Sequence, residues 1–197
     1  MSPDGEEAPL VLASDDALRQ DVSRFFESAF DSRLDLRRQL DQGSLVVSSG
    51  GRSMDIAQTG QGLTQVLPVA TMLLSAAKLG AGLDVIEHPE AEIHPGAHGT
   101  IADRLLSSIR AARDRPIVVE THSEMILLRA RRWIAEGRVS ASDVGVYWVD
   151  SDDDHGSSLS QIELTPDGDV VGWPEGVFYE NYEEILAIRR AARERRA

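Results

Sequence analysis

The sequence predicts an α/β fold with a mainly parallel sheet, crossover helices and a short antiparallel addition. Short apolar runs of the buried-strand type alternate with stretches whose apolar residues have helical spacing. Such alternation is typical of parallel sheets that helices cover on both faces. The strands are expected at 83–87 (LDVIE), 116–120 (PIVVE) and 144–150 (VGVYWVD), the helices at 97–113 and 123–136, and an edge or hairpin strand at 158–164 (SLSQIEL).

Caps, turn residues and apolar spacing predict the remaining elements. The glycine-rich turn SSGG follows an extended region, and glycines end the most amphipathic helix. These signals predict a loose start at 1–9, a helix at 14–30, extended segments around 33–40 and 44–48, an amphipathic helix at 63–79, and a C-terminal helix from about 179 that packs Tyr182, Ile185 and Leu186.

The composition excludes several classes of protein. Of the 197 residues, 42% are hydrophobic and 27% are charged, which excludes a wholly disordered chain. Cysteine is absent, which excludes a disulfide scaffold and thiolate catalysis. No apolar run is long enough to span a membrane and no secretory signal is present, so we expect a cytoplasmic protein without a membrane partner. The start at Met1 with an acidic leader leads us to expect a natural short protein.

The charge balance argues against DNA binding by this chain alone. There are 33 acidic and 20 basic side chains, which gives a formal net charge of −13. Non-specific DNA affinity comes largely from basic side chains that neutralise phosphates. The arginine clusters at 129–132 and 189–196 are interpreted as solvated helix faces and helix ends.

Polar side chains directly follow two of the predicted strands. The sequence Glu87-His88-Pro89-Glu90 comes after the first apolar strand, and Glu120-Thr121-His122-Ser123 ends the second. Ligands bind beyond the carboxyl ends of strands in open α/β sheets, so these stretches are expected to lie side by side at a site. Mg²⁺ prefers carboxylates together with water and phosphate oxygens, which this edge could supply.

Three ordered motifs resemble the C-terminal half of an ABC-type ATPase domain. They are QTGQGLTQVLP at 58–68, LDVIEHPEAEIHP at 83–95 and VVETHSEMILLRARR at 118–132. The resemblance is closest to predicted AAA/ABC-like ATPases of the overcoming-lysogenization-defect and RecF-type groups, whose tail the segment at 173–186 also resembles. It implies an N-terminal region at 1–54, an ATPase-like lobe at 55–186 and a basic tail at 187–197.

The resemblance implies a role for each motif in binding ATP and Mg²⁺. Glu87 corresponds to the Walker B acid that holds Mg²⁺, and His122 to the switch histidine that senses the γ-phosphate. The signature-loop position, which meets a nucleotide held by the opposite subunit, is occupied by Thr59, Gly60, Gln61 and Gly62. Glycines there let the backbone approach a phosphate, and a helix N-terminus favours an anion.

Two departures from the family pattern shape the functional hypothesis. The residue after the Walker B acid is ordinarily the glutamate that orients the attacking water, but here it is His88, so either His88 or Glu90 is the candidate for that role. No G-x-x-x-x-G-K-[ST] motif occurs in the 197 residues, so the Walker A grip on the phosphates is missing. These departures predict a split ATPase whose Walker A lobe comes from a second polypeptide, with hydrolysis only in the combined domain.

The resemblance also implies head-to-tail dimers of composite domains, contact with DNA only through the complex, and a role in DNA repair or anti-phage defence. Two alternatives stay open. One is a non-hydrolysing, degenerate ATPase lobe that acts as an assembly module. The other is a metal-dependent hydrolase, whose ligands would come from His88, Glu90, His94, His98 and His122.

Overall fold

The computed structural model describes residues 6–39, 42–111, 114–152, 156–173 and 188. The chain divides into two compact units, Met1–Arg129 and Ala130–Ala197. The predicted tail, including the segment at 174–187, and the end of the acidic loop at 153–155 lie outside the described residues. The predicted domain bounds at 54 and 186 stay predictions.

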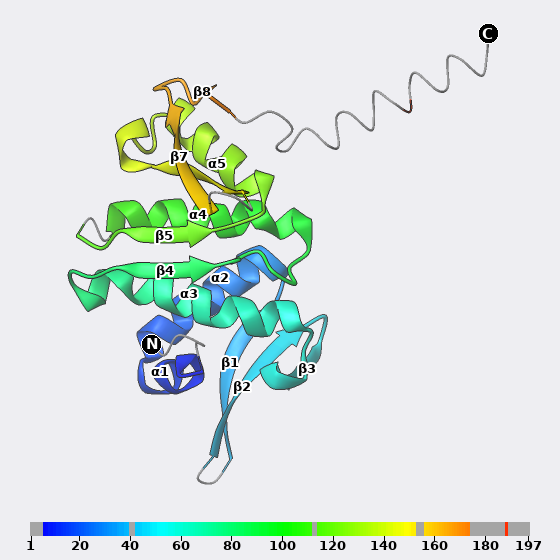
Figure 1. Ribbon diagram of the computed structural model, residues 1–197. Coiled ribbons are helices and arrows are strands. Elements are labelled where there is room, and N and C mark those ends of the chain that lie inside the picture. The colour runs from blue at the N-terminus through cyan, green and yellow to red at the C-terminus, as the bar shows by residue number, and fades with distance from the viewer. Residues whose placement is uncertain (1–5, 40–41, 112–113, 153–155, 174–187, 189–197) are drawn as a thin grey trace. The chain divides into compact units, whose positions relative to one another are not determined.

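The first unit contains a three-stranded antiparallel sheet, a two-stranded parallel sheet and most of the helices (Figure 1). In chain order its elements are α1 (Ala8–Ser14), α2 (Asp16–Phe30), β1 (Arg33–Gln39), β2 (Gln42–Ser49), β3 (Arg52–Asp55), the 3-10 helix η1 (Ile56–Gln58), α3 (Gln61–Leu79), β4 (Asp84–Glu87), α4 (Pro95–Ala111) and β5 (Ile117–Glu120). Helix α5 (Glu124–Ala135) crosses from the first unit into the second.

The core of the first unit forms where α2, α3 and the inner faces of both sheets meet. Phe25, Phe26 and Phe30 of α2 pack edge to face, with ring centroids 5.6 to 6.2 Å apart. Asp15 caps α2 by accepting a hydrogen bond from Leu18 N, and its other oxygen lies 2.7 Å from Lys78 Nζ of α3. One acidic residue therefore both starts α2 and ties it to α3.

An ion pair lies at the start of the parallel sheet. The Arg115 guanidinium binds both carboxylate oxygens of Asp84, at 2.6 and 2.8 Å. The Asp84 side chain is only 4% exposed, so the two-point contact neutralises a carboxylate that burial would otherwise penalise.

Two parts of the first unit differ from the sequence prediction. Helix α1 begins at Ala8, inside the stretch expected to be a loose start, and its proline stands in the first turn where a helix tolerates it. The SSGG turn leads into an additional strand, β3. Gly50 and Gly51 have φ of 56° and 77°, which is the backbone of a two-residue turn that joins hairpin strands.

The second unit is built around an antiparallel hairpin. Its elements are the 3-10 helix η2 (Ala141–Asp143), β6 (Val146–Asp152), β7 (Gly156–Leu164) and β8 (Val170–Val171). β6 pairs with β7 in the register Val146 to Ile162, as expected for the strand at 158–164. Among the described residues β6 pairs only with β7, so the strand expected at 144–150 belongs to an antiparallel hairpin and not to the parallel sheet.

The α/β fold class is confirmed, and the parallel pairing consists of β4 with β5. None of the described helices combines the length and apolarity needed to cross a membrane.

Candidate functional site

The predicted strand tips meet at one edge of the parallel sheet. β4 and β5 lie side by side (Figure 1). They pair from Asp84 with Ile117 to Glu87 with Glu120, so the two glutamates end the ladder as partners. The ladder continues one step further, because His88 N donates to the carbonyl of Glu120 at 2.9 Å. The juxtaposition predicted from parallel-sheet topology is therefore present.

Two imidazoles stack directly beyond this edge. The rings of His88 and His122 are 4.7 Å apart at their centroids with 26° between their planes. His88 Nε2 also lies 3.9 Å from a carboxylate oxygen of Glu120. His88 has a left-handed backbone, with φ of 46°, and its side chain is 38% exposed. The loops after β4 and β5 thus present one histidine each at a common, solvent-accessible position.

Glu90 connects these two loops from below the surface. The residue is 9% exposed, and its Oε1 accepts a hydrogen bond of 2.8 Å from the backbone N–H of His122. Its Oε2 is buried and has no hydrogen-bond partner among the described residues. Since an unpaired buried carboxylate oxygen is costly, Glu90 holds His122 in place at the expense of some stability.

His98 adds a second connection between the same loops. Its Nδ1 lies 2.9 Å from Ser123 Oγ, and its Nε2 lies 3.2 Å from the carbonyl of Ile93. Ser123 N in turn donates to Thr121 Oγ1 at 3.0 Å. Two side-chain contacts, Glu90 with His122 N and His98 with Ser123, therefore join the loop after β4 and the start of α4 to the loop after β5.

The loop of Thr59 to Gly62 lies against the β4–α4 loop. A Cβ added to Gly62 would stand 2.6 Å from the carbonyl oxygen of Glu92. A Cβ added to Gly60 would meet nothing within 4 Å, and Gly60 is the N-cap of α3 without a side-chain capping bond. Thr59 Oγ1 donates to Ile56 O at 2.6 Å and fixes the loop's first residue. Gly62 therefore serves close packing, whereas Gly60 leaves the start of α3 open.

The four histidines that the structure describes do not converge on a metal site. His94 Nδ1 accepts a hydrogen bond from Gly96 N, and both ring nitrogens of His98 are engaged as described above. Among the described residues, no group of three His, Cys, Asp or Glu side chains is placed to hold a metal ion. The metal-hydrolase alternative therefore finds no ligand set in this part of the chain.

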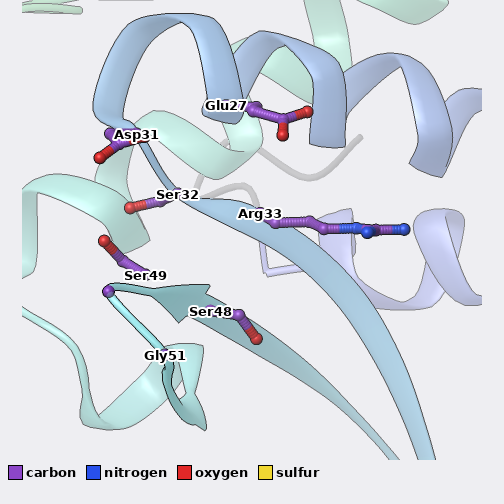
Figure 2. A pocket seen from close by; sticks show the side chains of 8 residues that line it. Glu27, Asp31, Ser32, Arg33, Ser48, Ser49 and Gly51 are labelled. Carbon is purple, nitrogen blue, oxygen red and sulfur yellow. The ribbon is translucent and has the colours of Figure 1, made fainter.

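Two hollows of the described surface lie away from the sheet edge. One, of about 230 Å³, is lined by the end of α2, the start of β1 and the β2–β3 turn, and it includes Glu27, Arg33 and Gly51 (Figure 2). Another, of about 660 Å³, includes the end of α2, His94 and Ala97. Neither of these two hollows is lined by a residue predicted to bind ATP or Mg²⁺.

Three features of the site were not predicted from the sequence. They are the in-register partner of Glu87, the hydrogen bond from His122 to Glu90, and the contact of Gly62 with Glu92. Of these features, only the contact of Gly62 with Glu92 leaves a mark in the sequence. A glycine in the first turn of a helix is unfavourable, so its presence there indicates close packing.

Comparison with known proteins supports the same architecture. Solved structures of SMC ATPase heads share the fold, although their sequence identities are too low to show more. An SMC ATPase from work on ATP-driven dimerization and DNA-stimulated activation has a TM-score of 0.58 at 13% identity, covering 91% of this chain and 97% of that chain. The Smc head of Pyrococcus furiosus, bound to the C-terminal domain of ScpA, has a TM-score of 0.56 at 14% identity, covering 95% of this chain and 41% of that one.

The Smc head of Pyrococcus yayanosii gives a TM-score of 0.53 at 14% identity, and this chain spans 28% of its length. No curated protein sequence is significantly similar to the chain. The family described as "AAA domain, putative AbiEii toxin, Type IV TA system" matches residues 3–129, which is more than half of the chain. The resemblance to an ABC/AAA-type ATPase domain is thereby confirmed, and the chain belongs to this AAA-domain family.

Proposed function

We propose that the chain is one subunit of a split ABC-type ATPase, completed by a second polypeptide that carries the Walker A motif. The observation that carries the proposal is the meeting of Glu87, His88 and His122 at one sheet edge, in a chain without a phosphate-gripping lysine loop. Membership of an AAA-domain family and the likeness to SMC heads support nucleotide binding.

The residues at the sheet edge fit Mg²⁺ and the end of a triphosphate. Glu87 is an exposed carboxylate at the carboxyl end of β4, with Glu120 beside it in register. Oxygen ligands that leave room for water suit Mg²⁺. When bound there with ATP, Mg²⁺ would neutralise the negative charge that develops on the phosphates. Glu87 is the residue proposed to hold it.

His122 is proposed as the sensor of the terminal phosphate, and His88 as the group that positions the attacking water. Both imidazoles reach the same exposed position, whereas Glu90 is buried with one oxygen bonded to His122 N. Of the two candidates for orienting water, the geometry therefore favours His88. Glu90 is proposed to act through His122, as a positioning residue.

The open start of α3 is proposed to meet a nucleotide held by another copy of the complex. Gly60 leaves free space at the N-terminus of a 19-residue helix, and unpaired N–H groups at such an end attract anions. Head-to-tail dimers of composite domains follow from this arrangement. The structural similarity of this chain to an SMC ATPase that was studied for ATP-driven dimerization supports this part of the proposal.

A non-hydrolysing subunit is the second candidate function. The observation that favours it is His88 itself, because an imidazole replaces the carboxylate that the family pattern uses. The cellular role is proposed to be anti-phage defence or DNA repair in the cytoplasm, with DNA reached only through the complex. The family description, which names an AbiEii toxin and a type IV toxin–antitoxin system, supports the defence setting.

Reconstitution tests the split arrangement. The chain is purified alone and together with a polypeptide of the same genome that carries G-x-x-x-x-G-K-[ST], and ATP turnover is measured with Mg²⁺ and with EDTA. We expect turnover only in the pair with Mg²⁺, and a loss of about 100-fold or more in Glu87→Gln or His122→Ala.

Glu163→Gln, an exposed glutamate on β7, is the matched control and should leave turnover unchanged. ATP turnover by the isolated chain would overturn the split arrangement. Nucleotide binding by the pair without turnover would establish the second candidate instead.

A further inference from the structure

The ring of His98 has a fixed partner at each nitrogen. His98 lies at the start of α4 and is half-buried, and its Nε2 is 3.2 Å from the carbonyl oxygen of Ile93. A carbonyl oxygen can only accept a hydrogen bond, so Nε2 carries the ring proton. In the neutral ring Nδ1 then has the lone pair, and Ser123 Oγ is its donor at 2.9 Å. The contacts therefore select one tautomer of His98 and one direction for the Ser123 hydroxyl.

The Ile93 carbonyl is a firm anchor for this ring. Ile93 is buried in the core of the first unit, and its N–H donates to the carbonyl of Glu90 at 3.3 Å. The preceding residue, Glu92, is the one whose carbonyl oxygen lies against Gly62 of α3. Since the core and α3 both restrain this stretch of chain, the acceptor of His98 cannot shift without disturbing packed neighbours.

Contacts between α4 and α5 bring His98 to Ser123. Arg129 of α5 pairs with Asp103 of α4 at 2.8 Å. The Arg129 guanidinium also lies so near Gly99 that a Cβ at that position would overlap it. The glycine next to His98 therefore lets the start of α4 approach α5 closely, and the ion pair holds the two helices there.

Ser123 carries the restraint to its neighbour, His122. Ser123 is 6% exposed, whereas His122 is exposed. Glu90 accepts a hydrogen bond from His122 N, and the hydroxyl of the next residue, Ser123, is held by His98. The backbone is thus fixed on both sides of the exposed imidazole, which can keep its stack with His88 without being buried.

We infer that His98 is a positioning residue that acts through Ser123 on His122. The inference rests on the proposed function, in which His122 senses the terminal phosphate. A sensor that is already fixed in place needs no reorganisation as charge develops on that phosphate, so it stabilises the transition state more. Loss of the His98 contact is therefore expected to lower kcat for ATP while changing KM little.

Nuclear magnetic resonance on the isolated chain tests the geometry without ATP. Long-range ¹H–¹⁵N spectra should show the proton of the neutral His98 ring on Nε2. A nuclear Overhauser effect between the rings of His88 and His122 reports their stack. We expect Ser123→Ala and His98→Leu to abolish this effect. His98→Gln should retain it, because an amide offers one donor and one acceptor, as the neutral imidazole does.

Ser75→Ala is the matched control. Ser75 is 8% exposed, and its hydroxyl donates to the carbonyl of Met72 within α3, at 2.9 Å. Removing it deletes a buried hydroxyl away from the two loops, so the ring-to-ring effect should persist. Circular dichroism melts establish that each variant is folded, and the smaller change Ser123→Ala serves if His98→Leu does not fold.

ATP turnover by the pair with the Walker A-bearing polypeptide of the same genome is the second readout. We expect His98→Leu and Ser123→Ala to lower kcat about tenfold or more and to keep KM within about twofold. His98→Gln should stay within about threefold of the unchanged kcat, and Ser75→Ala should match it.

The outcomes separate this inference from the proposed function. A ring stack that survives both His98→Leu and Ser123→Ala, or an unchanged kcat in a pair that turns over ATP, overturns the positioning role and leaves the split ATPase standing. Loss of the stack in those variants, in a pair that never hydrolyses ATP, supports the positioning role and contradicts the hydrolytic proposal. A neutral ring with its proton on Nδ1 overturns the assigned contacts.

Discussion

The glycine at position 62 links the signature-loop segment to the loop after β4. Its missing side chain faces the Glu92 carbonyl oxygen, at 2.6 Å from where a Cβ would stand. We predict that Gly62→Ala lowers the free energy of unfolding by about 1–3 kcal/mol, because neither backbone can yield without disturbing its own element. Urea unfolding followed by circular dichroism measures this loss.

Gly60→Ser is the control for that prediction. Space around Gly60 is open and its φ is −63°, so a serine fits and can cap α3. We expect stability equal to or slightly above that of the unchanged protein. Equal destabilisation by both substitutions would contradict the packing role of Gly62.

The buried Glu90 carboxylate offers a second test at the level of one residue. We predict that Glu90→Ala removes the acceptor of His122 N and so frees the loop after β5 from the loop after β4. Hydrogen exchange at the His122 amide should speed up by at least about tenfold.

Glu90→Gln keeps an acceptor oxygen, so it should restore most of the protection of the His122 amide. Exchange that is equally fast in both variants would show that Glu90 does not hold His122. A role limited to filling volume would be met by glutamine and by methionine alike, so Glu90→Met separates volume from hydrogen bonding.

Parallel-sheet topology was sufficient to predict that Glu87, His88 and His122 meet. The carboxyl ends of parallel strands always share an edge, and that rule needs no knowledge of the loops. The bond between Glu90 and His122, by contrast, depends on left-handed backbone at His88 and Glu92, with φ of 46° and 57°. Loop conformations of that kind leave no periodic pattern in a sequence, so this part of the site could not be predicted.

At the scale of elements, the contact of α2 with α3 depends on the charge of Asp15. The hydrogen bond from Lys78, together with that from Leu18 N, lowers the pKa of Asp15. A lowered pKa in the folded state means that the ionised form stabilises the fold above the unfolded-state pKa, and that this contribution disappears as the pH falls through the folded-state value.

We therefore predict that the free energy of unfolding falls less between neutral and acidic pH in Asp15→Asn than in the unchanged protein. Asparagine still caps α2 but cannot pair with Lys78 or titrate. The stability difference between the two proteins should be largest above about pH 4 and shrink towards zero below it. Unfolding in urea from pH 2.5 to 7 measures it, and a difference that does not vary with pH would contradict the assignment.

Helices and short apolar strands were predictable wherever their periodicity was strong. The helices α2, α3, α4 and α5 and the strands β1, β2, β4, β5, β6 and β7 lie where apolar spacing and caps place them. α1 was missed because two prolines and three acidic residues mask its start, and β3 because only four mostly exposed residues form it. The partner of β6 could not be deduced from its apolar run, since a run of that kind suits a parallel or a hairpin strand equally.

At the scale of the whole molecule, charge decides what the chain contacts. With a formal net charge of −13, we predict that the isolated chain binds duplex DNA with a Kd weaker than about 10⁻⁴ M at 0.15 M salt. Fluorescence anisotropy with a labelled duplex measures this. Micromolar binding that weakens steeply with added salt would show that the arginines form a contiguous basic surface after all.

The whole-molecule arrangement is the least predictable part of the protein. The length of the chain predicts one domain with appendages. The structure instead has two compact units, and the boundary between them falls within α5. An amphipathic helix has the same sequence pattern whether it lies inside one unit or joins two. The exposure of Val85 and Val118 could not be predicted for a related reason, because an apolar strand has the same sequence pattern whether one or both of its faces are covered.

The left-handed backbone of His88 restricts how this position can evolve. Branched side chains such as valine, isoleucine and threonine are strained at φ of 46°, so substitutions to them are disfavoured whatever the chemistry requires. Glu92, four residues later, shows that the same loop carries a glutamate at φ of 57°. An acid could therefore replace the imidazole without a change of the main chain, and one substitution would then place a carboxylate directly after Glu87, as in the ATPase family that the motifs resemble.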